Sequence, residues 1–127
     1  MLSPLTLAVF AKAPTPGAVK TRLCPPLTQE QAARLYAAFV CDTVRIAQAV
    51  APPTLFYSGD REPLARLLAE NALSLAQWQP QGDGDLGARM ARVPAPCLIL
   101  GTDSPHLPLS FLQAALDHLD ACDVVLG

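Results

Sequence analysis

The sequence predicts an α/β protein in which a mainly parallel sheet lies between two layers of helices, a three-layer α/β/α arrangement. Short, nearly continuous apolar runs, typical of strands buried on both faces, alternate along the chain with segments whose apolar residues recur at helical spacing. The 127 residues suit one domain, 1–127, and the hydrophobic content of 51% excludes intrinsic disorder.

The first strand and the first helix have clear boundaries in the sequence. The apolar run Leu5–Ala11 predicts a buried strand, and a loop rich in proline and glycine follows over Lys12–Leu27. Thr28 and Gln31 have the spacing of a capping box, so the helix is expected to start at Thr28. It carries one apolar face and is expected to end before Pro52.

The remaining elements follow the same alternation. Further strands are expected over Thr54–Tyr57, Leu73–Trp78, Cys97–Leu100 and, as the start of a fifth strand, Asp123–Leu126. Further helices are expected over Pro63–Asn71, Leu86–Val93 (capped by Asp83 or Asp85) and Leu109–Leu119. If the first four strands stand in the order 3-2-1-4, the loops after strands one and four flank the point where strand order reverses, which is where ligands bind in such sheets.

The sequence stops at Gly127, directly after the expected fifth strand, and no helix follows to cover that strand. Three explanations stay open: a fragment that lacks its C-terminal part, an edge strand, or a strand covered by a partner such as a second copy in a homodimer. We expect the first of these, a domain truncated at its C-terminal side.

Charge and hydropathy exclude several classes of partner. The net charge of −2 and a pI near 5.5 leave no basic stripe for nucleic acid. No apolar run approaches the roughly 20 residues of a membrane span, and no basic segment precedes Leu5–Ala11 as in a secretory signal. A cytoplasmic protein without a membrane partner is expected.

The cysteines indicate no metal site. None of the four forms a CxxC pair, and neither histidine has zinc-ligand spacing. Cys41, Cys97 and Cys122 lie in apolar patterns and are expected to be reduced core residues. Cys24, in a proline-rich loop, is the thiol that we would test for reactivity.

The first segment that carries chemistry is KAPTPGAVKTR, residues 12–22. It holds both lysines of the chain, Lys12 and Lys20, together with Arg22, and Gly17 lets the backbone approach a ligand. Three cations after the first strand suit a phosphate or pyrophosphate. The segment is not a Walker loop, because valine precedes Lys20. A solvated loop whose lysines aid only solubility is the alternative.

The second segment, GTDSP over residues 101–105, delivers Asp103 to the carboxyl end of the fourth strand. A carboxylate there can hold Mg²⁺ or Mn²⁺ that bridges the phosphates of a nucleotide. The alternative is that Asp103 only caps a turn before the proline.

The third segment, QGDGDLGARM over residues 81–90, opens a short helix. Gln81 offers a donor and an acceptor, as reading the edge of a base requires, and Arg89 can point back to an anion. Asp83 and Asp85 are secondary candidates for metal ligands. The alternative is a flexible turn in which Asp85 caps the helix and Arg89 pairs within it.

Together, FAKAPTPGAVKTRL (10–23), the GDLG core of residues 81–90 and LGTDSPHLP (100–108) resemble the glycosyltransferase-A-like proteins of a bacterial domain-of-unknown-function family. Its members are often described as radical-SAM/selenodomain-associated transferases. More distantly, the chain is similar to 2-phospholactate guanylyltransferase and molybdenum-cofactor guanylyltransferase. Family members continue beyond this point with a Gly-Pro…Asp-Gly-Gly-Tyr segment, of which Gly127 looks like the first residue.

The resemblance implies the Rossmann-like fold of the nucleotide-diphospho-sugar transferases (GT-A) and a metal-dependent nucleotide site. Lys20 and Asp103 would be the catalytic residues, with Asp103 holding Mg²⁺ or Mn²⁺. Gln81 and Gly82 would lie near the base. The implied nucleotide-binding residues are Phe10, Ala11, Lys12, Gly17, Lys20, Thr21, Arg22, Gln81, Gly82 and Arg89.

The function expected from the sequence is that of a metal-dependent nucleotidyl- or glycosyltransferase. Its donor would be a nucleoside triphosphate or a nucleotide sugar, and the sequence does not identify the acceptor. The alternative is a non-catalytic nucleotide-binding or oligomeric interaction module of the same fold.

Overall fold

The computed structural model describes residues 5–103 and 106–126, and these residues form an alternating α/β chain. The elements in order are β1 (Thr6–Lys12), the 3₁₀ helix η1 (Thr21–Leu23), α1 (Gln29–Val50), β2 (Thr54–Ser58), α2 (Arg61–Glu70), β3 (Gln77–Pro80), α3 (Leu86–Ala91), β4 (Cys97–Leu100) and α4 (Leu109–Leu119). The mixed α/β class predicted from the sequence is confirmed.

The sheet has four strands in the order β3-β2-β1-β4, and every neighbouring pair is parallel, as predicted. β4 reaches only to Leu100, which pairs with Val9, whereas β1 continues to Lys12 and pairs there with Ser58 of β2. The sheet is therefore open between β1 and β4 at its carboxyl edge. This is also where strand order reverses, because β1 leads to β2 on one side and β4 lies on the other.

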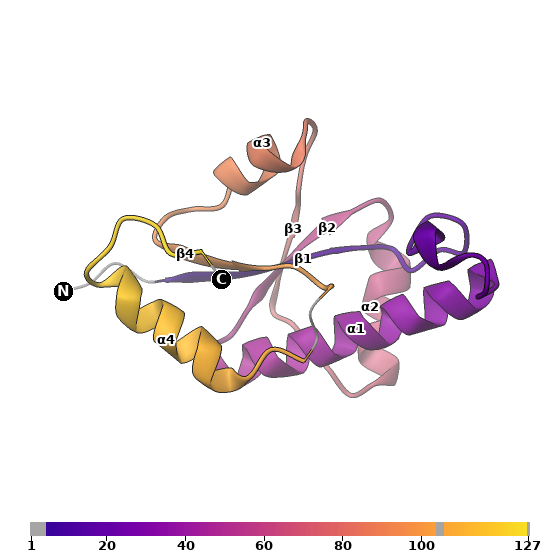
Figure 1. Cartoon of the computed structure of the whole chain (residues 1–127), viewed down its shortest axis with the longest axis horizontal. Helices are drawn as coiled ribbons and strands as arrows, with labels where there is room; N and C mark the ends of the chain where they lie inside the picture. Colours follow the sequence, from indigo (N-terminus) through magenta and orange to yellow (C-terminus); the bar gives the residue numbers. More distant parts are fainter. Residues whose placement is uncertain (1–4, 104–105, 127) are drawn as a thin grey trace.

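Helices cover the two faces of the sheet unequally. Figure 1 shows α1, α2 and α4 on one face, with α3 alone on the other. The larger core lies under α1 and α2 and includes Leu7, Val9, Val40 and Leu55. The smaller core, on the α3 face, consists of Ala8, Phe10, Phe56 and Val93, with the rings of Phe10 and Phe56 stacked 5.6 Å apart. Three layers are present, and the layer formed by the six-residue α3 is thin.

The start of α1 confirms the predicted capping box. Thr28 Oγ1 accepts a hydrogen bond from the Gln31 backbone N–H at 3.1 Å, and Gln31 Oε1 accepts one from the Thr28 N–H at 2.9 Å. The helix ends at Val50, before the two prolines. Such a cap contributes about 1 kcal/mol and fixes where the loop after β1 must end.

One buried side chain fixes that loop to the body of the protein. Val19 is 2% exposed and belongs to the larger core, although it lies between two exposed or half-exposed residues, Ala18 and Lys20. The loop reverses at Gly17, whose φ of +84° is unfavourable for residues with a Cβ. The segment that carries the lysines is thus anchored at its centre.

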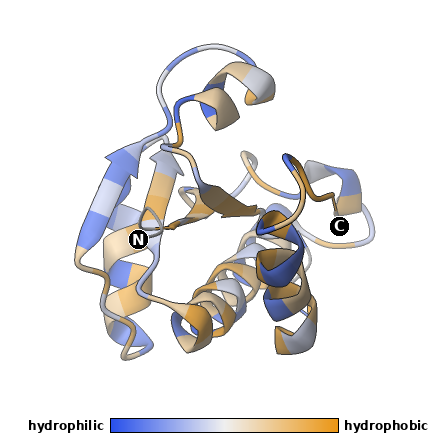
Figure 2. Cartoon of the chain, turned by 90° about the vertical axis from the view of Figure 1, so that its left-hand side faces the viewer, coloured by the Kyte–Doolittle hydropathy of each residue, from blue (hydrophilic) through white to orange (hydrophobic). Residues whose placement is uncertain are grey.

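The third strand was predicted in the wrong place. It spans Gln77–Pro80, not Leu73–Trp78, and Figure 2 shows it as the hydrophilic edge of an otherwise hydrophobic sheet. The apolar Leu73 ends α2 instead: its N–H bonds to Leu68 O at 2.8 Å, while the N–H of Ala72, at φ +57°, bonds to Ala69 O. This is a Schellman motif, in which the residue after the left-handed position is commonly buried.

The expected fifth strand over Asp123–Leu126 is also wrong for the described residues, in which those positions pair with no strand. Val125 and Leu126 instead border an apolar cavity of about 490 Å³ between β4 and α4. The apolar run is too short to specify backbone pairing, and its residues Val124 and Leu126 are exposed.

Smaller differences concern helix ends. α2 begins two residues earlier than expected, at Arg61, and the Asp60 side chain makes no capping bond. Asp85, not Asp83, caps α3 by accepting the Ala88 N–H at 2.8 Å. No helix among the described residues has the length and hydrophobicity that a membrane crossing requires.

Candidate functional site

A cavity of about 460 Å³ opens at the carboxyl ends of β1 and β4. Its lining residues come from the ends of both strands, the loop before η1, η1 itself and α1: Lys12, Ala18, Val19, Lys20, Thr21, Arg22, Leu23, Tyr36 and Asp103. Three cationic side chains and one carboxylate line it, so the cavity is positively charged. The structure therefore brings together the cations of the first segment and the carboxylate of the second, as the strand order predicted.

Lys20 lines this cavity and pairs with its carboxylate. Its Nζ lies 2.5 Å from Asp103 Oδ1 and 5.3 Å from the centre of the Phe39 ring. Its backbone is left-handed, with φ 53° and ψ 35°, a conformation that costs about 1–2 kcal/mol for a residue with a Cβ. The side chain of Lys20 is 21% exposed and that of Asp103 79% exposed, so solvent screens the ion pair and its contribution to stability is small.

Asp103 is the donor that could hold a divalent cation. Mg²⁺ keeps several waters and needs only one or two carboxylates besides phosphate oxygens, which an exposed carboxylate at a strand end can provide. Within residues 5–103 and 106–126, no three His, Cys, Asp or Glu side chains gather into a metal-binding group. The residues fit an ion shared with a bound phosphate and do not fit an all-protein cage.

Tyr36, which lines the cavity, and Thr102, which bonds to Tyr36, are two polar residues that the sequence did not predict for the site. The hydroxyl of Tyr36 accepts a hydrogen bond from the backbone N–H of Lys12 at 3.0 Å and one from Thr102 Oγ1 at 3.1 Å. Both side chains are buried. The sequence placed Tyr36 only on the apolar face of α1; the signal for more was its polar tip within an otherwise apolar stripe.

The other nucleotide-binding residues predicted in and just before the first segment lie around this site in different ways. Thr21 starts η1 and lines the cavity, whereas Gly17 lies earlier in the loop and does not line it. Ala11 is buried in β1, and Phe10 faces the smaller core on the α3 side. Their nucleotide-binding roles stay predictions.

Gln81 is a buried connection between strands and helix. Its Nε2 donates to Phe56 O at 2.8 Å and to Ala11 O at 3.3 Å, and its Oε1 accepts from Arg89 Nη1 at 3.2 Å. Both ends of the amide are thus used within the protein, which is a structural role that the sequence did not predict. Reading a base remains a prediction that requires these bonds to be exchanged.

The glycine loop after β3 is held by two arginines. Arg89 Nε donates to Gly84 O at 2.9 Å, and Arg92 Nη1 donates to Gln81 O at 2.9 Å. A Cβ on Gly82, at φ +83°, would lie 2.7 Å from Arg92 Nη1. Arg89 is thus paired within the protein, but with the loop before α3 and with Ser58 of β2, not within its own helix as the alternative held. A contact between Arg89 and an anion stays a prediction.

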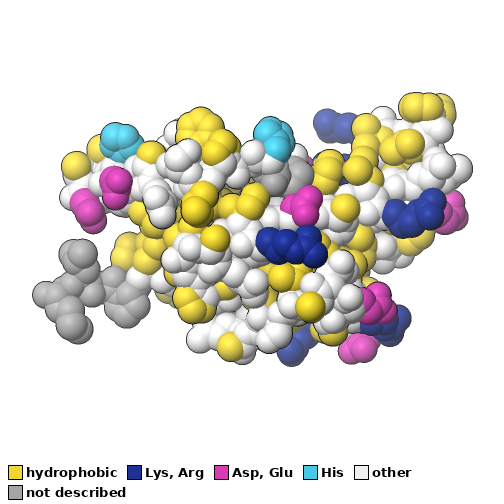
Figure 3. Space-filling model, turned by 90° about the horizontal axis from the view of Figure 1, so that it is seen from below, with side chains coloured by type: hydrophobic (Ala, Val, Ile, Leu, Met, Phe, Trp, Pro, Cys, Tyr) yellow, Lys and Arg dark blue, Asp and Glu magenta, His cyan; other side chains and the backbone are white. Residues whose placement is uncertain are grey.

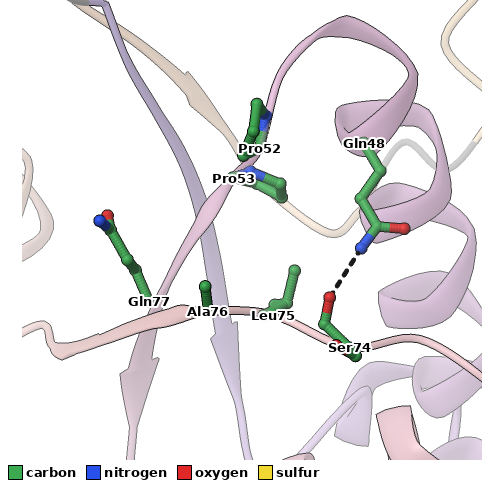
Figure 4. Close-up of a pocket in the computed structure, with 7 residues that line it drawn as sticks. All are labelled: Gln48, Pro52, Pro53, Ser74, Leu75, Ala76 and Gln77. Atoms are coloured by element: carbon green, nitrogen blue, oxygen red, sulfur yellow. Dashed lines mark hydrogen bonds between the residues drawn. The ribbon is translucent and has the colours of Figure 1, made fainter.

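Two other cavities differ in chemistry. Figure 4 shows one at the amino ends of β2 and β3, lined by Gln48, Pro52, Pro53, Ser74, Leu75, Ala76 and Gln77, where Gln48 bonds to Ser74 O. It has no charged lining residue and lies at the opposite edge of the sheet from Asp103. The other, beside β4, is mostly apolar, although Asp103 and His118 also border it.

Charges elsewhere are dispersed. On the face seen in Figure 3, the described Lys and Arg side chains stand apart from one another, beside acidic and hydrophobic ones. Of the cavities described, the one at the ends of β1 and β4 alone combines several cations with a carboxylate, so we take it as the candidate site.

Comparisons with known proteins agree with this assignment of the fold. The model of a family described as "Uncharacterized protein conserved in bacteria (DUF2064)" matches residues 42–127, which include the second and third segments. A crystal structure from Desulfovibrio desulfuricans G20, provisionally described as a nucleotide-diphospho-sugar transferase, is similar with a TM-score of 0.73 and 29% identity over 91% of this chain. The match covers 54% of that chain, so this sequence spans about half its length. No curated protein matches.

Proposed function

This chain belongs to the bacterial family DUF2064, and from that premise we propose that it binds a nucleoside triphosphate or nucleotide sugar as a metal-dependent nucleotidyl- or glycosyltransferase. The observation that carries the proposal is the cavity in which Lys12, Lys20 and Arg22 meet Asp103. The likeness to a provisionally described nucleotide-diphospho-sugar transferase supports the same class.

The cationic side chains would bind the phosphates. Lys12 and Arg22 offset phosphate charge from opposite ends of the loop, while Lys20 exchanges its contact with Asp103 for one with a phosphate oxygen. Mg²⁺ or Mn²⁺ held by Asp103 would supply further charge neutralisation on the phosphates. Positioning and charge neutralisation need no protein nucleophile, because the acceptor attacks the donor directly.

Two reactions share this donor site. In nucleotidyl transfer, an acceptor oxygen attacks the α-phosphorus and pyrophosphate leaves. In glycosyl transfer, the acceptor attacks the sugar carbon and a nucleoside diphosphate leaves. The leaving group distinguishes them, so release of pyrophosphate or of a nucleoside diphosphate from the bound donor identifies the reaction.

The test of donor binding is a thermal-unfolding panel with six probes: ATP, GTP, CTP, UTP, dTTP and UDP-glucose, each with and without Mg²⁺. A ligand at 100 times its Kd stabilises by about 2.7 kcal/mol, which raises Tm by several degrees. We expect a metal-dependent rise that Asp103→Asn and Lys12→Gln abolish. Arg66→Gln is the matched control, because it removes one positive charge from α2 outside the cavity. Flat curves for a cooperatively melting wild type would contradict the proposal.

A non-catalytic binding module is the second candidate. It is favoured by the single carboxylate of the cavity, since the described residues hold no group of three metal-ligating side chains. A module of this kind gives the same Tm shift in the panel but releases neither leaving group over hours, whereas a transferase releases one of them when its acceptor is present.

A further inference from the structure

We propose that Tyr36 is a positioning residue of the anion site, holding the ends of β1 and β4 at the separation that a phosphate requires. This inference rests on the proposed function and adds a residue to it. Tyr36 lies on α1, 5% exposed, with its ring in the larger core and its hydroxyl at the base of the charged cavity.

The hydroxyl replaces strand pairing where the sheet is open. Pairing between β1 and β4 ends at Val9 and Leu100, so the last residues of β1 have no β4 partner. The Ala13 N–H bonds to Ser58 on the β2 side. Amides alternate in direction along a strand, so the Lys12 N–H points to the β4 side, and there it donates to Tyr36 Oη at 3.0 Å.

The same oxygen reaches the other strand. Thr102 follows β4 by two positions, is buried, and donates its hydroxyl to Tyr36 Oη at 3.1 Å. Lys12 and Asp103, which both line the cavity, are therefore joined through one side chain from a third element: Lys12 directly, and Asp103 through its neighbour Thr102. Loss of the Tyr36 hydroxyl would free both ends and leave the part-buried Lys12 N–H and the buried Thr102 hydroxyl without their acceptor.

The test compares Tyr36→Phe, Thr102→Val and the double variant. Phenylalanine keeps the ring in the core, and valine keeps the shape of threonine. The probe is inorganic pyrophosphate with Mg²⁺, measured by titration calorimetry. We expect each single variant to weaken pyrophosphate binding about tenfold, which is the loss of affinity expected when one hydrogen bond that positions the site is removed.

The double variant separates bridging from two independent effects. If Tyr36 and Thr102 act through their shared bond, the double variant binds about as weakly as either single variant. If the two losses of affinity instead multiply, so that the double variant binds about a hundredfold more weakly than wild type, the proposal is overturned. Thr43→Val is the matched control: it removes another buried hydroxyl of α1, 4% exposed, which bonds only to Phe39 O of its own helix. Its pyrophosphate affinity is expected to stay within a factor of about two.

A second readout needs no ligand. In Tyr36→Phe, we expect amide hydrogen exchange to quicken selectively at Lys12, while amides in the centre of β1, such as that of Val9, keep their protection. Unchanged exchange at Lys12 would overturn the bridge. If wild type binds neither pyrophosphate nor any nucleotide, the proposed function fails and the role of Tyr36 in it fails too. The wild-type titration identifies that case by itself.

Discussion

At the scale of single residues, Lys20 combines a strained backbone with an ion pair in the candidate site. Its backbone adopts φ 53° although it is not glycine, and its ammonium group contacts the carboxylate of Asp103 in the cavity. Strain of this kind persists where the surrounding fold determines it and is frequent at binding sites. Glycine would suit this backbone better than lysine, so function and stability are expected to oppose each other here.

Replacing Lys20 by glycine and by alanine separates the two effects. Both variants lose the ammonium group, so both should lose nucleotide affinity. Only glycine relieves the left-handed strain, so Lys20→Gly should be more stable than Lys20→Ala by about 1 kcal/mol, after allowance for the greater freedom of unfolded glycine. Urea unfolding gives the difference. Equal stabilities would mean that position 20 is not left-handed in solution.

The cysteines allow a second prediction at this scale. Cys122 is exposed, contrary to the expectation from its apolar surroundings, Cys24 is half-buried, and Cys41 is buried. Burial raises the pKa of the Cys41 thiol, with a smaller opposing effect from Arg45, and burial also raises the pKa of Cys97. A higher pKa leaves less thiolate at a given pH, and the thiolate is the reactive form.

Thiol labelling at pH 8 followed by peptide mass analysis should therefore modify Cys122 first, then Cys24, with Cys97 and Cys41 slowest. Raising the pH should accelerate the labelling of Cys97, because its raised pKa leaves little thiolate at pH 8. Denatured protein, in which all four thiols are exposed, is the control. Early modification of Cys41 in folded protein would contradict the order.

At the scale of elements, the end of α2 explains why the third strand is not where the sequence predicts it. The sequence predicts a strand that includes Leu73 and Leu75, but Leu73 is the buried residue of a Schellman motif that ends the helix. An apolar residue predicts burial, and Leu73 is buried by the end of a helix as well as it would be by a strand. By contrast, the capping box of α1 was predictable because its donors and acceptors are only three residues apart.

The Schellman motif gives a prediction for α2. Ala72 occupies the left-handed position, at φ 57°, where glycine is the common residue. Ala72→Gly should stabilise the protein by about 1 kcal/mol. The matched control is Ala69→Gly, one turn earlier in the exposed helical part, which should destabilise by about 1 kcal/mol. Thermal unfolding measures both, and the same sign for the two variants would contradict the assigned helix end.

At the scale of the whole molecule, strand order is what assembles the site. Segments that follow β1 and β4 meet because these strands are neighbours, so Lys20 contacts Asp103 across 83 residues of sequence. That meeting could be predicted from the order 3-2-1-4. The roles of Tyr36 and Gln81 could not, because each depends on a bond to a backbone group whose position is set by how far the strands extend, besides a bond to a distant side chain.

The buried Val19 has a consequence for the rate at which a ligand would associate. Because the Val19 side chain lies in the core, the loop after β1 that carries Lys20 has little freedom to move before or after it meets a ligand. Association should then be a single bimolecular step, with an observed rate that rises linearly with ligand concentration and shows no plateau. Stopped-flow mixing would measure it. In Val19→Gly, loop ordering should precede binding, and the rate should saturate.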